Sequence, residues 1–309
     1  GVSGAAAVSA RDPWTADLGI DAATARAAIA EQFPHLAGCE VVAFGEGWDN
    51  AAFLVGERYV FRFPRRRVAV ALIETELRVL PVLARRLPLP VPHPRFSGVP
   101  SDAFAWPFAG YERLAGEALV HVRLRDAAYG ALAYALGEFL RVLHGIAPEA
   151  LPPLPGDEIG RFAHARLLPL LTRRLEELRA AGLIADAAPA LVAFELLAPG
   201  APRRQSCVVH GDLYARHVLV DAAQRVSGVI DWGDLHVGDP AIDLSVAFSI
   251  LPREFRETFA RAYGKIDERT WELARYRAIY SSVLLAHYGY KIGDAAILRA
   301  GLDGFARSV

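Results

Sequence analysis

Residues 207–245 read CVVHGDLYARHVLVDAAQRVSGVIDWGDLHVGDPAIDLS, and this stretch decides the fold. It begins with a short apolar run that leads into His210-Gly211-Asp212. Two further apolar runs, HVLVD and VSGVID, are separated by polar residues, so we expect a β-hairpin. Asp231 stands at the end of the second run. The pattern therefore predicts two carboxylates, Asp212 and Asp231, at the ends of adjacent strands.

Two carboxylates placed in this way suit phosphoryl transfer. The reaction needs one carboxylate to orient the attacking hydroxyl and another to hold the metal ion that neutralises the phosphates. A lone His-Gly-Asp is more often an ordinary turn, but here DWGD and GDPAID follow it. The sequence contains no Walker motif, which excludes a P-loop enzyme.

The segments HGDLYARHVLVD, GVIDWGD and GDPAIDLS resemble the Brenner-type motif of the aminoglycoside and macrolide phosphotransferases, which are relatives of the eukaryotic protein kinases. The resemblance extends over about residues 40–250 and is strongest in the segment quoted first. It implies ATP-dependent transfer of a phosphoryl group to a hydroxyl of a small molecule, with Mg²⁺ as the metal. GTP in place of ATP stays open, because the sequence does not decide between them.

The resemblance also implies roles for single residues. Asp212 matches the catalytic aspartate, Asp231 matches the metal-binding aspartate, and Asp243 matches an aspartate that supports the catalytic loop. His210 is expected to brace the same loop, because a buried and hydrogen-bonded histidine beside a turn needs no catalytic role. The family usually has asparagine five residues after the catalytic aspartate, where this chain has His217. We expect His217 to be the second metal ligand, although Mg²⁺ prefers oxygen.

In the first third of the chain, FGEGWDNAAFLV resembles the hairpin that covers the nucleotide, and Gly45 and Gly47 are its candidate contacts. The same glycines would also suit an ordinary hairpin turn. RYVFRFP resembles the strand that supplies a cation to the α- and β-phosphates, which makes Arg62 the candidate. Glu76 on the following helix is its expected ion-pair partner, the alternative being a solvated helix face.

The segment Tyr111-Glu112-Arg113-Leu114 resembles the hinge that receives the adenine base. Glu112 and Leu114 are therefore candidate nucleotide contacts. Hinge contacts are mostly made by the backbone, so the side chains say little about which base is bound.

The order of patterns predicts the architecture. Helical periodicity is expected at 22–36, 68–87, 131–146, 161–182, 255–264 and 268–290, and strands at 39–44, 51–55, 58–64, 95–97 and 104–113. This order indicates an α+β chain with a β-rich first third. Together with it, the resemblance to the phosphotransferases implies a protein-kinase-like bilobal fold, with a small β-rich N-terminal lobe at 1–114, a larger and mainly helical C-terminal lobe at 115–309, and ATP in the cleft between them.

Composition limits the partners. The 309 residues include 34 lysines and arginines and 35 aspartates and glutamates, so no overall field favours nucleic acid or an anionic membrane. The first residues lack the pattern of a signal peptide and no apolar run would span a bilayer, so we expect a cytoplasmic protein. Cys39 and Cys207 are far apart in the sequence, which argues against a disulfide framework or a zinc site.

The acceptor is left open. Residues 251–309 contain ten Lys or Arg, seven Asp or Glu and many aromatic residues. A neutral or apolar acceptor, such as a macrolide sugar, is thus at least as consistent as a polycationic aminoglycoside. A metabolite kinase acting on a choline-, homoserine- or sugar-like substrate, or a nucleotide-binding pseudokinase, are the alternatives. The oligomeric state is not predicted.

Overall fold

The computed structural model describes residues 16–47, 49–200 and 206–309. Residues 1–15, where we expect no signal peptide, and Trp48 in the predicted hairpin lie outside the described residues. The chain divides into two compact units. Among the described residues, the first unit contains 16–78 and 93–113, and the second contains 79–92 and 114–309. The lobe boundary expected after residue 114 stays a prediction.

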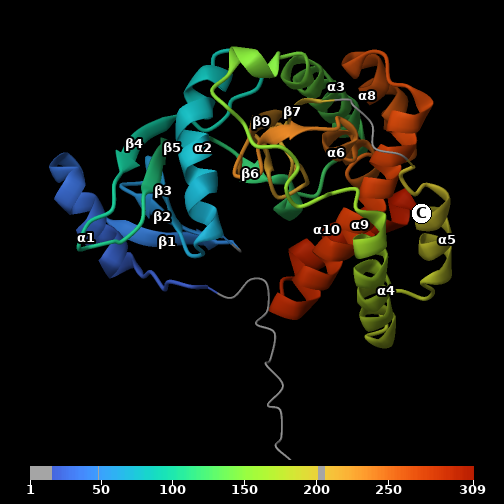
Figure 1. The fold of residues 1–309 in the computed structure, drawn as a ribbon, viewed down its shortest axis with the longest axis horizontal. Helices are drawn as coiled ribbons and strands as arrows, with labels where there is room; N and C mark the ends of the chain where they lie inside the picture. The colour runs from blue at the N-terminus through green and yellow to red at the C-terminus, as the bar shows by residue number, and fades with distance from the viewer. Residues whose placement is uncertain (1–15, 48, 201–205) are drawn as a thin grey trace, which may run out of the picture. The chain divides into compact units, whose positions relative to one another are not determined.

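The first unit is built on a five-stranded antiparallel sheet (Figure 1). Its strands are β1 (Val41–Glu46), β2 (Asn50–Val55), β3 (Tyr59–Pro64), β4 (Pro94–Gly98) and β5 (Phe108–Glu112), in the order β1-β2-β3-β5-β4. The strands expected at 39–44, 51–55 and 58–64 are present as β1, β2 and β3, which pair in sequence order.

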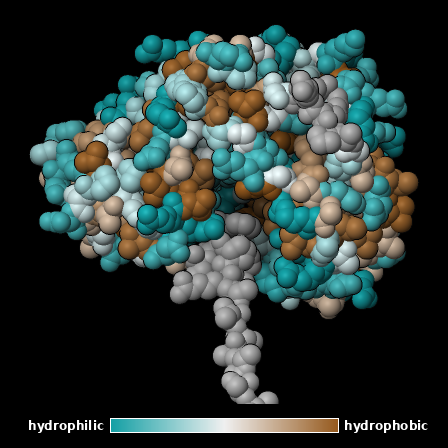
Figure 2. Space-filling view, viewed as in Figure 1, coloured by the Kyte–Doolittle hydropathy of each residue, from teal (hydrophilic) through white to brown (hydrophobic). Residues whose placement is uncertain are grey.

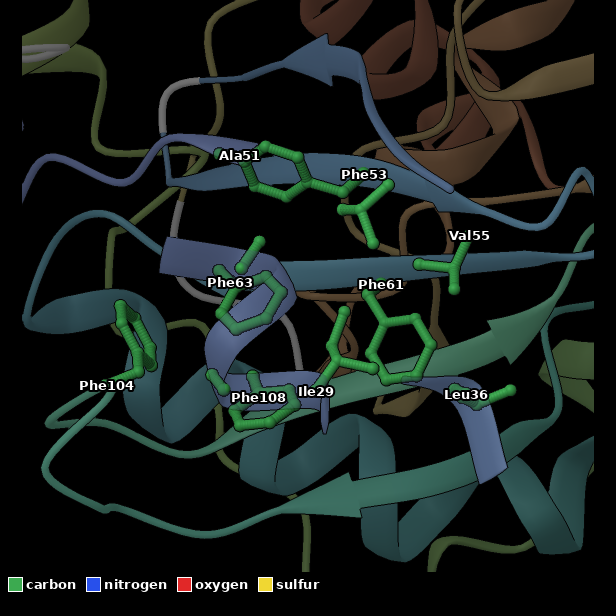
Figure 3. Packing of buried hydrophobic residues seen from close by; sticks show 12 residues of the cluster. Ile29, Leu36, Ala51, Phe53, Val55, Phe61, Phe63, Phe104 and Phe108 are labelled. Carbon is green, nitrogen blue, oxygen red and sulfur yellow. The ribbon is translucent and has the colours of Figure 1, made fainter. Parts of the chain in front are cut away.

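Successive side chains of a strand point to opposite faces of the sheet, and β3 shows the consequence. Phe61 and Phe63 are fully buried on one face, where Phe63 stacks on Phe108 with ring centroids 4.4 Å apart. Figure 3 shows these rings and Ile29 of α1 (Ala22–Gln32) gathered in one core. Arg62 belongs to the other face, which leaves its guanidinium for a different partner.

Two helices accompany this sheet. Asp21 caps α1 by accepting a hydrogen bond from the backbone N–H of Thr24 at 2.8 Å. The helix ends at Gln32, earlier than predicted, because the residue before Pro34 is disfavoured in the helical conformation. The helix α2 (Val68–Leu83) ends before the proline-rich segment at 88–94.

Two small sheets form the β structure of the second unit. β7 (Cys207–Val209) pairs with β10 (His236–Gly238), while β6 (Glu117–Ala118), β8 (Val218–Val220) and β9 (Val226–Val229) form a three-stranded antiparallel sheet. The predicted hairpin is thus β8–β9. The strands that lead to Asp212 and to Asp231 lie in different sheets, however, so the expectation of adjacent strand ends was wrong.

Helices make up most of the second unit (Figure 1). They are α3 (Asp126–His144), α4 (His164–Ala180), α5 (Ala188–Leu196), α6 (Ala241–Leu244), α7 (Val246–Ser249), α8 (Arg256–Tyr263), α9 (Glu268–Ile292) and α10 (Ala295–Ser308). Leucines of α4 pack with Phe194 of α5 and Tyr276 of α9 in one buried cluster. This cluster anchors α9 against α4 and α5.

None of the described helices combines the length and the apolarity that a membrane span requires. Hydrophilic and hydrophobic residues are interspersed on the face that Figure 2 displays. Cys39 and Cys207 are both free thiols.

Candidate active site

The loop between β7 and β8 is organised by one buried carboxylate. Asp243 of α6 is fully buried and accepts hydrogen bonds from the backbone N–H groups of His210, at 2.7 Å, and Gly211, at 2.9 Å. His144 at the end of α3 approaches the same carboxylate, with Nε2 3.1 Å from Oδ2. Burial by itself would raise the pKa of Asp243, but the hydrogen bond from His144 and the one from the backbone N–H of Gly211 are among the interactions that lower it overall. Asp243 therefore stays ionised and holds the start of the loop.

His210 is fully buried and bonded within the same segment. Its Nε2 lies 3.0 Å from the carbonyl oxygen of Ile230, and its Nδ1 faces the backbone N–H of Asp212 at 3.3 Å. Nε2 therefore carries the proton and Nδ1 accepts. Burial lowers the pKa of His210, which keeps the ring neutral. These contacts are those that the predicted bracing role requires.

His217 connects the two predicted carboxylates. Its Nδ1 donates to the backbone carbonyl of Asp212 at 2.8 Å and lies 3.7 Å from the Asp212 Oδ2. Its Nε2 lies 3.2 Å from Oδ2 of Asp231. Burial disfavours the charged ring, but Asp231 and Asp212 outweigh burial and raise the pKa of His217.

The hairpin explains why these side chains meet. Val218 pairs with Val229 across β8 and β9, and the backbone N–H of Ile230 donates to the carbonyl of His217 at 2.9 Å. Asp231 is thus delivered directly beside His217. It adopts φ +64°, the left-handed region that is unfavourable for a residue other than glycine. Strain of this kind is stored at functional sites, so it favours a functional role for Asp231.

Asp212 has the environment of a general base. Partial burial raises its pKa, and the neighbouring Asp234 and Asp231 carboxylates add to this effect, while His217 and Arg161 oppose it. The side chain keeps 43% of its surface exposed, so it is accessible to an acceptor. A carboxylate with a raised pKa takes a proton more readily than an ordinary one.

The donor set at Asp231 fits a divalent cation. Among the described residues there is no ready-made group of three or more His, Cys, Asp or Glu side chains for a metal ion. Asp231 is 44% exposed and offers a carboxylate. His217 Nδ1 donates to the Asp212 carbonyl, so Nε2 is the nitrogen that would ligate a metal ion, once the ion displaces the proton that Nε2 shares with Asp231. Mg²⁺ is usually bound by one or two carboxylates together with water and substrate phosphates, so a sparse protein site is what such chemistry needs.

In the first unit, Arg62 and Glu76 form the predicted ion pair. Nη1 of Arg62 lies 2.7 Å from Oε1 and 2.9 Å from Oε2 of Glu76. Glu76 in α2 is 1% exposed and also accepts a hydrogen bond from the hydroxyl of Tyr111, at 2.7 Å. A cation on the third strand paired with a glutamate on the next helix is the arrangement that protein kinases require for catalysis. The solvated-face alternative for Glu76 is therefore wrong.

Neither of the two hairpin glycines is required by the backbone conformation or by lack of space. Neither Gly45 nor Gly47 has a positive φ, so positive φ is not the reason for glycine here. A Cβ on Gly45 would meet nothing within 4 Å, and one on Gly47 would meet only Asn50, at 3.7 Å. The N–H of Gly47 donates to the carbonyl of Asn50 at 2.9 Å, within the hairpin. Their role as nucleotide contacts stays a prediction.

The side chains of the two predicted hinge residues, Glu112 and Leu114, face other protein residues. Glu112 at the end of β5 directs its side chain to Arg58, at 3.1 Å, and to Arg95, at 3.0 Å. Only its backbone is left for a base. Leu114 packs toward Gly228 of β9, where an added Cβ would lie 2.9 Å from the leucine Cδ1. Nothing in these contacts tests adenine binding.

Comparison with known proteins decides the family. The model of the phosphotransferase enzyme family matches residues 40–279. The chain belongs to this family. A viomycin phosphotransferase from Streptomyces vinaceus is 34% identical over 164 residues, which make up 50% of this chain and 52% of that protein. The chain thus matches about half of the length of this curated phosphotransferase.

Solved structures of phosphotransferases share the fold. The GDP complex of wild-type aminoglycoside 2'-phosphotransferase-IIIa superposes with a TM-score of 0.68 at 23% identity, covering 94% of this chain and 98% of that one. Macrolide 2'-phosphotransferase type I gives a TM-score of 0.56 at 24% identity, covering 93% of this chain and 97% of that one. The predicted α+β, kinase-like fold and the resemblance to this phosphotransferase family are confirmed.

The sequence did not indicate three contacts that support the candidate site of this member of the family. His144 reaches Asp243 from α3, Tyr111 reaches Glu76 from β5, and Arg161 reaches Gly211 from the loop before α4. His144 and Tyr111 lie in segments that resemble the family, but a hydrogen bond across the fold leaves no local pattern. Arg161 lies in a segment without any motif, so no signal could have singled it out.

Proposed function

We propose that this protein transfers the γ-phosphoryl group of a Mg-nucleotide to a hydroxyl of a small molecule. The observation that carries the proposal is the cluster in which His217 bridges Asp212 and Asp231. Asp212 orients the acceptor hydroxyl and takes its proton as the new P–O bond forms and the bond to the leaving diphosphate breaks. A bound Mg²⁺ supplies neutralisation of the phosphate charge, and Asp231 with His217 would hold it.

Each remaining predicted residue has a task in this proposal. Arg62 contacts the α- and β-phosphates, and Glu76 keeps its guanidinium in place by accepting from Nη1 with both carboxylate oxygens. Asp243 and His210 hold the backbone that carries Asp212. Glu112 and Leu114 receive the base through backbone groups, and Gly45 and Gly47 lie in the hairpin over the phosphates.

The similar proteins suggest which acceptors to test. A relative that is a viomycin phosphotransferase favours an antibiotic acceptor, although the match covers only half of that protein. Proteins of this fold were solved with GDP and with streptomycin and ATP. Both nucleotides, and acceptors from several chemical classes, therefore belong in the assay. We propose a cytoplasmic location, because such nucleotides are cytoplasmic metabolites.

The test is acceptor-dependent consumption of Mg-ATP and Mg-GTP by the purified protein. Viomycin, an aminoglycoside, a macrolide, choline and homoserine form the panel, with the product hydroxyl identified by mass spectrometry. Replacement of a general base lowers turnover about 10²- to 10⁴-fold, which is the loss expected for Asp212→Asn. Equal nucleotide consumption by wild type and Asp212→Asn would contradict the proposal, and so would nucleotide binding without turnover of any acceptor class.

A further inference from the structure

Arg161 is a buried arginine, 5% exposed, in the loop before α4. Each of the three guanidinium nitrogens donates a hydrogen bond to a different group. Nε donates to the carbonyl of Gly211 at 3.0 Å, Nη1 donates to Oδ1 of Asp157 at 2.8 Å, and Nη2 donates to Oδ1 of Asp234. Asp157 also fixes the arginine backbone, accepting from its N–H at 2.6 Å. One side chain thus joins three separate segments.

The carbonyl of Gly211 matters because it belongs to the peptide group that continues into the N–H of Asp212. Gly211 has φ +87°, and a Cβ at this position would lie 2.2 Å from the carbonyl oxygen of Asp234. Its own N–H is held by Asp243. Gly211 is therefore fixed at its N–H by Asp243 and at its carbonyl by Arg161.

We propose that Arg161 is a positioning residue for phosphoryl transfer, which fixes the peptide group before Asp212 and joins it to the loop that carries Asp234. The inference rests on the proposed function, in which Asp212 orients the acceptor hydroxyl. Arg161 acts through Gly211 and does not itself touch the acceptor.

Charge adds to the reason for an arginine here. Asp157 and Asp234 bind this guanidinium directly, and Asp212 also feels its charge. Arg277 is a second cation near Asp212 and Asp157, but loss of Arg161 would remove the cation that Asp157 and Asp234 share. Lysine cannot replace Arg161, because a single ammonium does not reproduce a planar fork that reaches three acceptors in different directions.

The experiment compares Arg161→Lys with wild type, using the acceptor that the wild-type protein turns over. We expect kcat to fall about 10²-fold, the loss that small misplacements of a catalytic group produce. The KM for nucleotide and the stoichiometry of Mg-nucleotide binding, measured by calorimetry, should stay unchanged, because neither depends on Gly211. Asp234→Asn keeps the contact between Arg161 and Gly211, so its kcat should fall less.

Arg256→Lys is the matched control. Arg256 is also partly buried and donates to two backbone carbonyls, those of Ala247 at 3.1 Å and Arg307 at 2.6 Å, outside the catalytic loop. We expect this variant to lose stability and to keep its kcat per nucleotide-binding chain. Amide hydrogen exchange at Asp212 should accelerate in Arg161→Lys and not in Arg256→Lys.

Three results would overturn the inference. They are an unchanged kcat in Arg161→Lys, a fall in kcat that only follows a fall in nucleotide-binding stoichiometry, and an equal fall in Arg256→Lys. An active wild type with any of these results would leave the proposed function standing. A wild type without turnover would overturn the proposed function and this inference together.

Discussion

Nη1 of Arg62 donates to both carboxylate oxygens of Glu76, at 2.7 and 2.9 Å, and the carboxylate is 1% exposed. A buried carboxylate depends on its partner, because the charge is far from water that could solvate it. The pair therefore has two consequences in this protein: it fixes the orientation of the Arg62 guanidinium, which we propose contacts phosphate, and it makes the stability of the sheet depend on Arg62.

Arg62→Ala should be strongly destabilising. Removal of one partner from a buried ion pair lowers the free energy of unfolding by about 3–5 kcal/mol, since the other charge stays buried. Urea unfolding monitored by circular dichroism measures this loss, and Mg-nucleotide binding should weaken in parallel. Arg58→Ala is the control, because the Arg58 and Glu112 side chains are 66% and 39% exposed. Loss of such a surface pair changes stability by about 1 kcal/mol or less. Equal losses in the two variants would contradict the prediction.

Asp243→Asn should impair both stability and turnover. Asp243 accepts from the N–H groups of His210 and Gly211 with two different oxygens. Asparagine has one acceptor oxygen, so one buried N–H would face an NH₂ group. A buried donor without an acceptor costs about 1–3 kcal/mol. Chemical denaturation and kcat measure the two effects.

Asp239→Asn provides the control for that substitution. Asp239 accepts from the backbone N–H of Ala241 at 2.9 Å, and the amide oxygen of asparagine can accept the same hydrogen bond. This variant should unfold close to the wild-type denaturant midpoint. A loss as large as that of Asp243→Asn would mean that the two backbone hydrogen bonds are not the cause.

The sequence predicted best what is local. The hairpin β8–β9 was recognisable because alternating apolar runs flank a polar turn, and Asp231 follows the second run directly. The pairing of β7 with β10 was not recognisable, because β10 has only three residues and its partner lies 27 positions earlier, from His236 to Val209. The wrong expectation of adjacent strand ends came from this missing pairing.

The sequence indicated the two carboxylates of the candidate site but not the contacts of His217 that connect them. Asp212 and Asp231 stand in motifs, but the role of His217 between them depends on which ring nitrogen faces which residue. Nδ1 is engaged by the Asp212 carbonyl and Nε2 by Asp231. Only three-dimensional packing sets such an orientation, so spacing alone suggested a ligand without showing the contact.

Helix α10 was not predicted, because its stability depends on packing against α9. Gly301→Ala tests that packing. Glycine weakens an isolated helix, but here it permits close contact with α9. A Cβ on Gly301 would lie 2.2 Å from the backbone nitrogen of Ala286. Overpacking of this kind destabilises by about 1–3 kcal/mol. Thermal unfolding should show a lower Tm for Gly301→Ala.

Gly130→Ala is the matched substitution in an open position. Gly130 lies within α3, where an added Cβ would meet only Phe255, at 3.9 Å. Alanine in a helix interior is more stable than glycine by about 0.5–1 kcal/mol, so the Tm should rise. A rise in both variants would show that α9 and α10 are not in close contact at Gly301.

Glu177 gives the protein a predictable pH dependence of stability. It lies in α4 and contacts His287 Nε2 at 2.9 Å and Lys291 Nζ at 2.7 Å, both from α9. The hydrogen bonds from His287 and Lys291 lower the pKa of Glu177 from 4.5 to about 2. The folded pKa lies below the unfolded one, so the contribution to stability is complete above pH 4.5 and is lost as the pH falls toward 2.

Glu177→Gln should therefore lower the free energy of unfolding at neutral pH and have less effect in acid. The side chain is 34% exposed, so solvent screening limits the difference to about 1 kcal/mol. Urea unfolding of both proteins at a series of pH values measures it. Glu257→Gln is the control, because the Glu257 and Arg261 side chains are 78% and 72% exposed. A difference for Glu177→Gln that is independent of pH would contradict the assignment.

His217 should influence which metal ion the protein prefers. An imidazole nitrogen suits Mn²⁺ better than Mg²⁺, which takes oxygen ligands. Asparagine at this position would offer an amide oxygen to the metal, and its NH₂ could still donate to the Asp212 carbonyl that His217 Nδ1 contacts at 2.8 Å. His217→Asn should thus shift the preference from Mn²⁺ toward Mg²⁺ by several-fold, in acceptor-dependent turnover and in calorimetric titration of each metal with nucleotide present. The same Mn²⁺-to-Mg²⁺ ratio in both proteins would mean that Nε2 does not ligate the metal and that Asp231 holds it with the nucleotide phosphates alone.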